Sequence, residues 1–442
     1  MLGALIERTR KANPDLRIAS QRIAEARALG GVARSQALPF ANAGGEIARH
    51  RTSERLAVPP PGNPSTLHTT GFDAGWEVDV FGGLRRNIEA ADAEVEASIE
   101  AYRDLLVTLF AETAANYIEY RTLNERLRIT EANLQTQAES VELTQTRLED
   151  GIAPRIDVTE ATTNLETTRA ALPQFKTQIR QTWNRIAALT GGYPVSLEPL
   201  LSDHRPIPVP HKAIFTGLPA DLIRARPDVR QAERSLAAQA ARIGVAHADL
   251  FPRFTLFGDF GFQSVSTGDL LESRARFYSF GPAFRWEIFS AGRIRSNIQA
   301  AEARTEQALL GYENAVLLAV EEVESSMVAL ALEWDRLAAL QRAVASSGET
   351  VSLVKDNYRE GLVDFQRVLD AERTKFDTED RTAVSRGQIA LNYVALYKAL
   401  GGGSQVEVIP DEEPRIRVRT FGGPVAETRV APEPVPSSTS AP

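Results

Sequence analysis

The chain has 442 residues, of which 24% are charged, with a net charge of −8 at pH 7 and no cysteine. The lack of cysteine excludes disulfide staples, thiol catalysis and thiolate metal sites, and the net negative charge argues against nucleic acid as a partner. No run of eighteen apolar residues occurs, so no transmembrane helix is predicted, although strands can also cross a bilayer.

The N-terminal residues, MLGALIERTRKANPDLR, lack the apolar core of a secretory signal. We therefore expect either a protein that stays inside the cell or an export signal that lies outside the printed sequence.

The chain carries an internal duplication. WEVDVFGGLRRNI from Trp76 aligns with WEIFSAGRIRSNI from Trp286, an offset of 210, and NPDLR from Asn13 aligns with RPDVR from Arg226, an offset of 213. Solenoid repeats are much shorter, roughly 20 to 50 residues. The sequence therefore predicts two structural repeats, over residues 1–192 and 220–403. A Pro-rich connector, residues 193–219, joins them, and residues 404–442 are expected to form a disordered tail.

Each repeat is expected to contain the same four elements in the same order. A short helix is followed by a β-hairpin, a long helix and a returning helix. In the first repeat these are the short helix 14–38, the hairpin 40–80, the long helix 84–150 and the returning helix 155–190. In the second repeat they are the short helix 227–250, the hairpin 253–290, the long helix 293–360 and the returning helix 364–400. Asn13 followed by Pro14 is typical of a helix start, because the asparagine side chain caps the helix and proline suits its first position.

The long helices have a coiled-coil pattern. Apolar residues recur at seven-residue steps from Val316 to Tyr358, and the same phase runs from Leu106 to Leu148. A long helix spans about 100 Å and a returning helix about 57 Å. We therefore expect the short helix, about 37 Å long, to stack end to end on the returning helix and cover the remaining apolar stripe.

The predicted strands alternate apolar and polar residues. Their lengths are near the roughly 9 to 11 residues of a tilted strand that crosses a bilayer. The candidate membrane-facing aromatics are Phe72, Trp76, Phe254, Phe260, Phe262, Tyr278, Phe280, Phe284 and Trp286. The alternative is a half-buried sheet packed on the helices. Four strands cannot close a barrel, so strands embedded in lipid would require the chain to oligomerise.

Several motifs carry a family resemblance that covers residues 5–403. GLPADLIRARPDVRQAE from Gly217, FPR from Phe251, YREGLVDFQRVLDAER from Tyr358 and LYKALGGG from Leu396 resemble the TolC-like outer-membrane efflux factors, in the lipoprotein branch that serves resistance-nodulation-division (RND) pumps. The resemblance implies an α+β fold, mostly α, and a homotrimer with a twelve-stranded barrel in outer-membrane lipid and a helical tunnel through the periplasm. It also implies a periplasmic adaptor and an inner-membrane RND transporter as partners.

Members of this branch usually begin with a signal peptide and a lipid-bearing cysteine, and the printed sequence has neither. We therefore expect the native start to differ from the printed one, and acylation is left open.

The candidate functional residues lie at the helix turns. Gly151 and Gly361 interrupt the two helical hairpins at equivalent positions, where a left-handed residue reverses the chain; the resemblance implies that the adaptor meets the channel there. The candidate periplasmic gate residues are Asp364, Gln366, Arg367 and Asp370. Asp370 matches the family's gate aspartate, and threefold symmetry would turn it into a carboxylate ring. Its counterpart in the first repeat is Glu160.

An enzymatic function has little support. The five histidines show no metal-ligand spacing, and the sequence has neither a phosphate-binding loop after a strand nor a nucleophile elbow. We expect no catalysis, cofactor or metal. Two alternatives to an efflux duct are a soluble coiled-coil scaffold and the outer duct of a type I protein-secretion system. The sequence does not identify the exported compound.

Overall fold

The computed structural model describes residues 1–51, 53, 55, 64–201, 205–210 and 223–402. The predicted tail and much of the predicted connector lie outside these residues. The main elements are α1 (Leu2–Ala12), α2 (Pro14–Ser35), β1 (Phe40–His50), β2 (Ser65–Val78), α3 (Gly83–Glu149), α4 (Arg155–Leu189), α7 (Pro227–Ala248), β3 (Arg253–Ser264), β4 (Arg276–Arg285), α8 (Arg293–Arg359) and α9 (Phe365–Ala399). The predicted α+β, mostly helical fold class is confirmed.

Helix α1 was not predicted, because its residues carry too short an apolar pattern to identify a helix. It packs on α3, where Leu5 is fully buried beside Tyr117 and Tyr120. Two further short helices, η1 (Pro194–Leu197) and α5 (Glu198–Leu201), lie in the segment expected to be a connector. Leu197 and Leu201 join the same core cluster, so burial of apolar side chains accounts for both elements.

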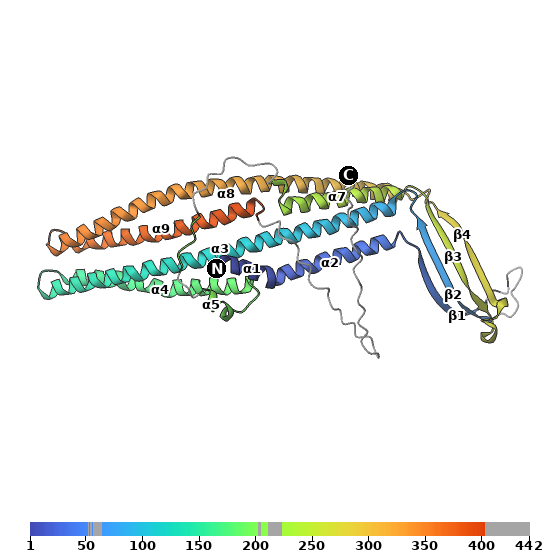
Figure 1. Cartoon of the computed structure of the whole chain (residues 1–442), viewed down its shortest axis with the longest axis horizontal. Coiled ribbons are helices and arrows are strands. Elements are labelled where there is room, and N and C mark those ends of the chain that lie inside the picture. The colour runs from blue at the N-terminus through green and yellow to red at the C-terminus, as the bar shows by residue number, and fades with distance from the viewer. Residues whose placement is uncertain (52, 54, 56–63, 202–204, 211–222, 403–442) are drawn as a thin grey trace, which may run out of the picture. The chain divides into compact units, whose positions relative to one another are not determined.

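The two long helices, α3 and α8, organise the helical layer (Figure 1). Each has 67 residues and spans about 100 Å. α3 packs against α2, α4, α7 and α9, whereas α8 packs against α7 and α9. The helices therefore form a row in the order α2/α4, α3, α7/α9, α8, and the predicted seam residues Val323, Leu330 and Leu337 are buried against α9.

The short helices stack on the ends of the returning helices, as expected from their lengths. Asn13 caps α2 by accepting from the amides of Asp15 and Leu16, and its Nδ2 donates to the carbonyl of Leu189 at the end of α4, 2.9 Å away. In the second repeat Nη1 of Arg226 donates to the carbonyl of Ala399 at the end of α9, 2.6 Å away. The same joint is thus built twice with different side chains.

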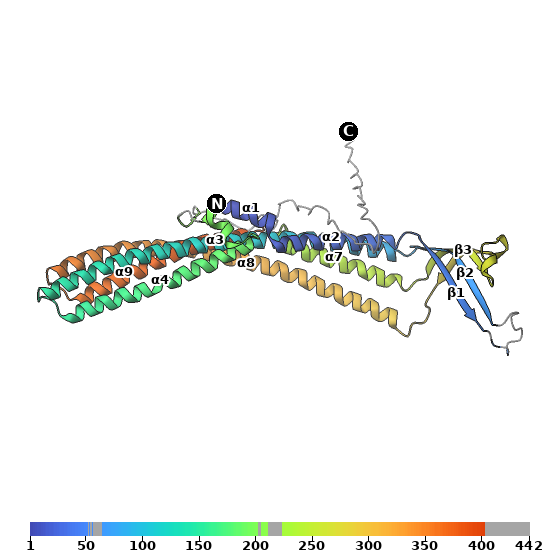
Figure 2. The same ribbon diagram turned by 90° about the horizontal axis from the view of Figure 1, so that it is seen from below.

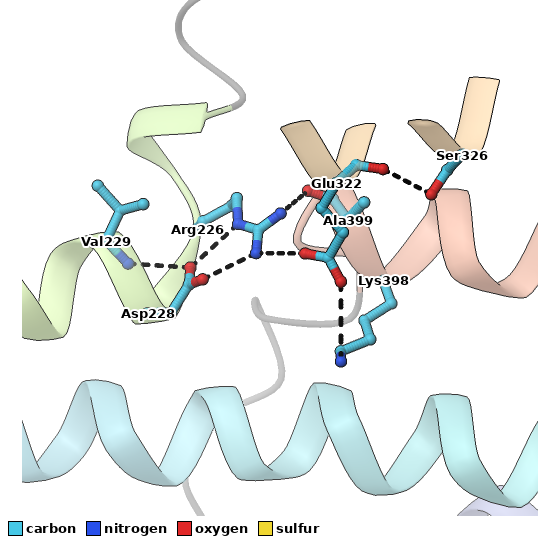
Figure 3. Close-up of polar contacts among 7 residues, drawn as sticks. All are labelled: Arg226, Asp228, Val229, Glu322, Ser326, Lys398 and Ala399. Carbon is cyan, nitrogen blue, oxygen red and sulfur yellow. Dashed lines mark hydrogen bonds and ion pairs between the residues drawn. The ribbon is translucent and has the colours of Figure 1, made fainter. Parts of the chain in front are cut away.

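The second joint carries a charged network (Figure 3). The guanidinium of Arg226, 8% exposed, pairs with Asp228 at 2.8 Å and with Glu322 at 2.7 Å. Burial alone would lower the pKa of Arg226, but these two carboxylates raise it. Nearby, burial and the negative charge of Asp228 raise the pKa of Asp104. Four helices, α3, α7, α8 and α9, therefore meet around the buried guanidinium of Arg226 and the partly exposed carboxylates near it.

The strands form one antiparallel sheet in the order β1-β2-β3-β4. Residues paired across neighbouring strands point to the same face of the sheet. Phe72 pairs with Phe260, Phe260 pairs with Tyr278, and Phe254 pairs with Phe284, so these aromatic side chains lie on one face. Every predicted strand aromatic that lies within β2, β3 or β4 falls on this one face. The opposite face carries polar residues, including Asp73 paired with Asp259.

Two of the four tryptophans, Trp76 and Trp286, lie near the junctions between strands and helices. The indole N–H of Trp76 donates to the carbonyl of Ala37 at 2.9 Å, and that of Trp286 donates to the carbonyl of Leu250 at 3.0 Å. The sequence placed Trp286 inside a strand, which was wrong: β4 ends one residue earlier, where its pairing with β3 ends at Arg285. Each indole therefore fixes the end of a short helix to its hairpin.

Within the described residues, no helix combines the length and the apolar character needed to span a membrane. In the same part of the chain, no cluster of three or more histidine, aspartate and glutamate side chains is arranged to hold a metal ion.

Candidate gate at the helix turns

The two helical hairpins end in turns of the same construction. Gly151 has φ +72° and Gly361 has φ +76°. In the first turn the amide of Ile152 donates to the carbonyl of Arg147, and in the second the amide of Leu362 donates to that of Asn357, each at 2.8 Å. This is the Schellman arrangement, in which a left-handed glycine ends a helix. Figures 1 and 2 show both turns at the end of the helices opposite the sheet.

The predicted gate residues lie just after the second turn. Asp364 caps α9 by accepting from the amide of Arg367 at 3.2 Å. Gln366 and Asp370 share a face, and Nε2 of Gln366 donates to Oδ1 of Asp370 at 3.0 Å. Gln366, Arg367 and Asp370 are exposed, whereas Phe365, Val368 and Leu369 between them are buried. The structure thus brings three of the four candidates onto one exposed face, while Asp364 has a capping role.

Residues of both repeats meet directly behind this face. The hydroxyl of Tyr358, at the end of α8, donates to Oδ2 of Asp157 on α4 at 3.0 Å. Burial and this bond raise the pKa of Tyr358 to about 12, so the hydroxyl keeps its proton. The guanidinium of Arg147 lies 4.7 Å from the Tyr358 ring centroid, and its Nη1 donates to the carbonyl of Arg359 at 2.7 Å. The two turns are therefore joined by a cation–π contact and two hydrogen bonds.

A buried carboxylate joins the hairpins further along the helices. Glu372 on α9, with a side chain only 1% exposed, pairs with Lys355 on α8 at 2.8 Å. The hydroxyl of Ser140 on α3 donates to the same carboxylate oxygen at 2.6 Å. A charge so deeply buried requires a partner, so Lys355 and Ser140 hold α9 against both long helices.

Two further polar contacts connect the hairpins. Arg126 on α3 forms a bidentate pair with Asp380 on α9, at 2.8 and 3.0 Å, and its guanidinium also lies over the ring of Phe175. Arg373 on α9 donates to Oδ1 of Asn164 on α4 at 3.1 Å. We call the interface formed by these contacts, between the α3–α4 and α8–α9 hairpins of one chain, the intrachain seam.

The intrachain seam was not predicted from the sequence. The seven-residue pattern identifies Tyr358 only as an apolar seam residue, and it does not show which charged residues face another hairpin. One signal was present: polar residues at Thr130, Gln137 and Thr144 recur at seven-residue steps along α3, and all three are buried.

The comparisons with known proteins agree with this architecture. The family model for outer membrane efflux proteins matches residues 5–192 and 218–402. The chain belongs to the outer membrane efflux protein family. Toluene efflux pump outer membrane protein TtgF of Pseudomonas putida is 32% identical, over 91% of this chain and 83% of that relative. Outer membrane protein OprJ of Pseudomonas aeruginosa is 32% identical, over 91% and 84%.

This efflux protein is also similar in three-dimensional structure to a solved outer-membrane channel. The outer-membrane channel OprN is 36% identical, with a TM-score of 0.87 over 92% of this chain and 91% of that one. The protein is accordingly an outer-membrane channel that extends into the periplasm and serves as the exit duct of a tripartite efflux pump, with an adaptor and an inner-membrane transporter as partners. Family members act as ducts rather than as enzymes, and the soluble-scaffold alternative was wrong.

Proposed function

We propose that three copies of the chain assemble into one duct. The observation that carries this proposal is that the edge strands of the sheet are connected to the outermost helices of the helical row. β1 and β4 are the edge strands, α2 runs directly into β1, and β4 runs directly into α8. A second copy that pairs β1 with β4 would therefore also bring α2 and α4 against α8. Three copies of four strands give a barrel of twelve, which leaves no open edge in lipid.

Exposed apolar side chains support this assembly. α8 packs mainly against α7 and α9. Its exposed surface carries large apolar side chains that a neighbouring copy would cover: Leu310, Leu317, Leu318, Val328, Leu332 and Leu353. The aromatic face of the sheet would then face outer-membrane lipid. Tyr278 and Phe280 on it are more than 70% exposed in the single chain, and aromatic girdles are typical of membrane barrels.

The turns form the periplasmic entrance in this assembly. Asp370, Gln366 and Arg367 would each occur three times around the axis, and a carboxylate ring at a narrow entrance favours cations and can gate the pore. Ile152 and Leu362 project from the two turns and are 63% and 68% exposed. We assign these turns, with Gly151 and Gly361, to contact with a periplasmic adaptor, and the pump partner to the RND class. The duct itself is passive and conducts what the transporter delivers.

The proposal is tested by deleting the gene and complementing the deletion with the wild-type chain. We expect the deletion strain to become more susceptible to compounds that the pump exports, and wild-type membranes to yield a complex that contains the adaptor and the RND transporter. Unchanged susceptibility together with no recovered partner would overturn it.

A further inference from the structure

We propose that the sheet binds lipid A, the phosphorylated glycolipid of the outer leaflet, through Arg49 and Arg276. This inference rests on the proposed trimer and its membrane barrel. Because the helices extend into the periplasm, the end of the sheet opposite the helices, which we call the outer end, lies toward the outer leaflet (Figure 1). β1 and β3 end there, and β2 and β4 begin there.

The aromatic face of the sheet carries charge at the outer end alone. The register with Phe72 puts Arg49 of β1 on this face, and the register with Phe260 puts Arg276 of β4 there. Within the four strands as the structure describes them, these two arginines are the only charged side chains on the aromatic face. The opposite face holds the carboxylates of the strands: Glu46, Asp73, Glu77 and Asp259.

Neither arginine is neutralised by a neighbouring carboxylate. Both side chains are exposed. Among the residues that the structure describes, Arg49 forms no ion pair, and Nε of Arg276 donates to the carbonyl of Ser273 at 3.2 Å. Three arginines near the helix end of the sheet are instead paired: Arg85 with Asp79, Arg253 with Asp249, and Arg293 with Glu287. The aromatic face therefore offers uncompensated positive charge at its outer end.

The position of these charges favours a phosphorylated lipid. A charged side chain on a lipid-facing surface is costly at the middle of the bilayer and is tolerated near the interface, where its long stem lies along apolar groups and its head reaches polar ones. A guanidinium forms paired hydrogen bonds with phosphate. Lipid A presents phosphate groups at the outer leaflet, so its charge complements the two arginines.

The internal duplication predicts how neighbouring chains place the two arginines. β1 aligns with β3 at the offset of 213, and β2 aligns with β4 at the offset of 210. The pairing of Thr70 with Phe262 therefore predicts that Phe280 pairs with Arg49 of the next copy. Within one chain, the row of paired residues that contains Phe280 starts at Ala41. The row thus advances from position 41 to position 49 over four strands, two residues per strand, and closure of a barrel requires a stagger of this kind.

This stagger brings the basic residues to nearly one height. At two residues per strand, His68 on β2 and Tyr278 on β4 lie level with Arg49, and Arg276 lies one step further out. Arg276 of one chain and Arg49 of the next then lie on adjacent strands, with Cα atoms roughly 14 Å apart. The hydroxyl of Thr66, opposite Arg49 in the sheet, adds a polar group to the same face. Each site is therefore built from two chains, at the junction between them.

Native mass spectrometry of the detergent-purified trimer, titrated with bisphosphorylated lipid A, tests the proposal. The test variant is Arg49→Gln/Arg276→Gln. Arg285→Gln is the matched control, because Arg285 is an exposed arginine of β4 on the opposite face of the sheet. Dephosphorylated lipid A and phosphatidylglycerol are the comparison lipids.

We expect the wild-type trimer to bind lipid A, and the Arg49→Gln/Arg276→Gln trimer to bind it roughly tenfold or more weakly, since basic residues near a membrane surface attract anionic headgroups. Arg285→Gln should bind lipid A like the wild type. Equal affinity of the wild type and the double variant, or an equal loss in Arg285→Gln, would overturn the inference. Binding of phosphatidylglycerol as tight as that of lipid A would overturn the assignment to lipid A.

Two further measurements separate charge from folding. Arg49→Lys/Arg276→Lys keeps both charges, so its affinity should lie closer to that of the wild type, and a loss as large as that of the glutamine variant would contradict a site held by charge. The wild-type trimer should bind dephosphorylated lipid A roughly tenfold or more weakly than lipid A, and equal binding would overturn the inference even if the variants did not assemble. Absence of a three-copy complex from the wild-type spectra would instead overturn the proposed trimer.

Discussion

The buried carboxylate of Glu372 gives the sharpest test of the intrachain seam. Glu372→Ala removes a side chain that is 1% exposed and leaves Lys355, 14% exposed, without its 2.8 Å partner. Breaking one side of a buried ion pair costs about 3 to 5 kcal/mol. With the conversion of roughly 2 to 4 °C per kcal/mol that holds for domains of about 150 to 250 residues, we expect the unfolding midpoint to fall by on the order of 6 to 20 °C.

The assay is thermal unfolding of the protein purified in detergent, followed by circular dichroism at constant scan rate. Thr162→Ala is the matched control, because Thr162 is the counterpart of Glu372 in the first repeat and is exposed; surface changes of this kind usually alter stability by less than about 0.5 kcal/mol. The double variant Glu372→Leu/Lys355→Met should recover much of the loss, since it removes both charges and restores apolar packing.

A midpoint for Glu372→Ala that lies within about 2 °C of the wild type would refute the reasoning, because removal of one member of a buried pair costs more than that. A double variant no more stable than Glu372→Ala would show that lost packing, rather than the unpaired lysine, causes the effect.

Three further predictions concern the turns and the helix joint. Gly361→Leu places a residue with a side chain at a backbone φ of +76°, which costs about 1 to 2 kcal/mol locally. We expect this variant to form trimers but not to export, and unchanged drug resistance would count against the prediction. Asp370→Ala should change the single-channel conductance and reduce cation preference in planar bilayers, and identical conductance would remove Asp370 from the gate. Folding raises the pKa of Asp104 above its ordinary value of 3.8. The contribution of protonated Asp104 to folding stability is therefore complete below pH 3.8 and is lost as the pH rises through the pKa that Asp104 has in the folded protein. Asp104→Asn should therefore raise the unfolding midpoint at pH 7 and not below pH 3.8, and an equal effect at both would contradict this sign.

Much of the fold could be predicted because it depends on local patterns. The heptads ending at Tyr358, the capping of α2 by Asn13 and the alternation around Trp76 each follow from neighbouring residues. The stacking of short helices on returning helices followed from lengths alone, and the joints at Leu189 and Ala399 agree with it.

The candidate site was less accessible because its contacts join residues that are distant in the sequence. Arg126 and Asp380 are 254 positions apart, and the sequence does not show whether a charge on a long helix faces solvent or another hairpin. Trp286 was misplaced for a related reason, since the end of β4 is set by its pairing with β3 rather than by its own alternation.

The number of chains in the detergent-extracted complex tests the central claim most directly. Native mass spectrometry of protein purified from the outer-membrane fraction should give three copies of the 48.4 kDa chain, with loss of the complex when detergent is removed. A stable single chain in detergent-free buffer would contradict the proposed duct.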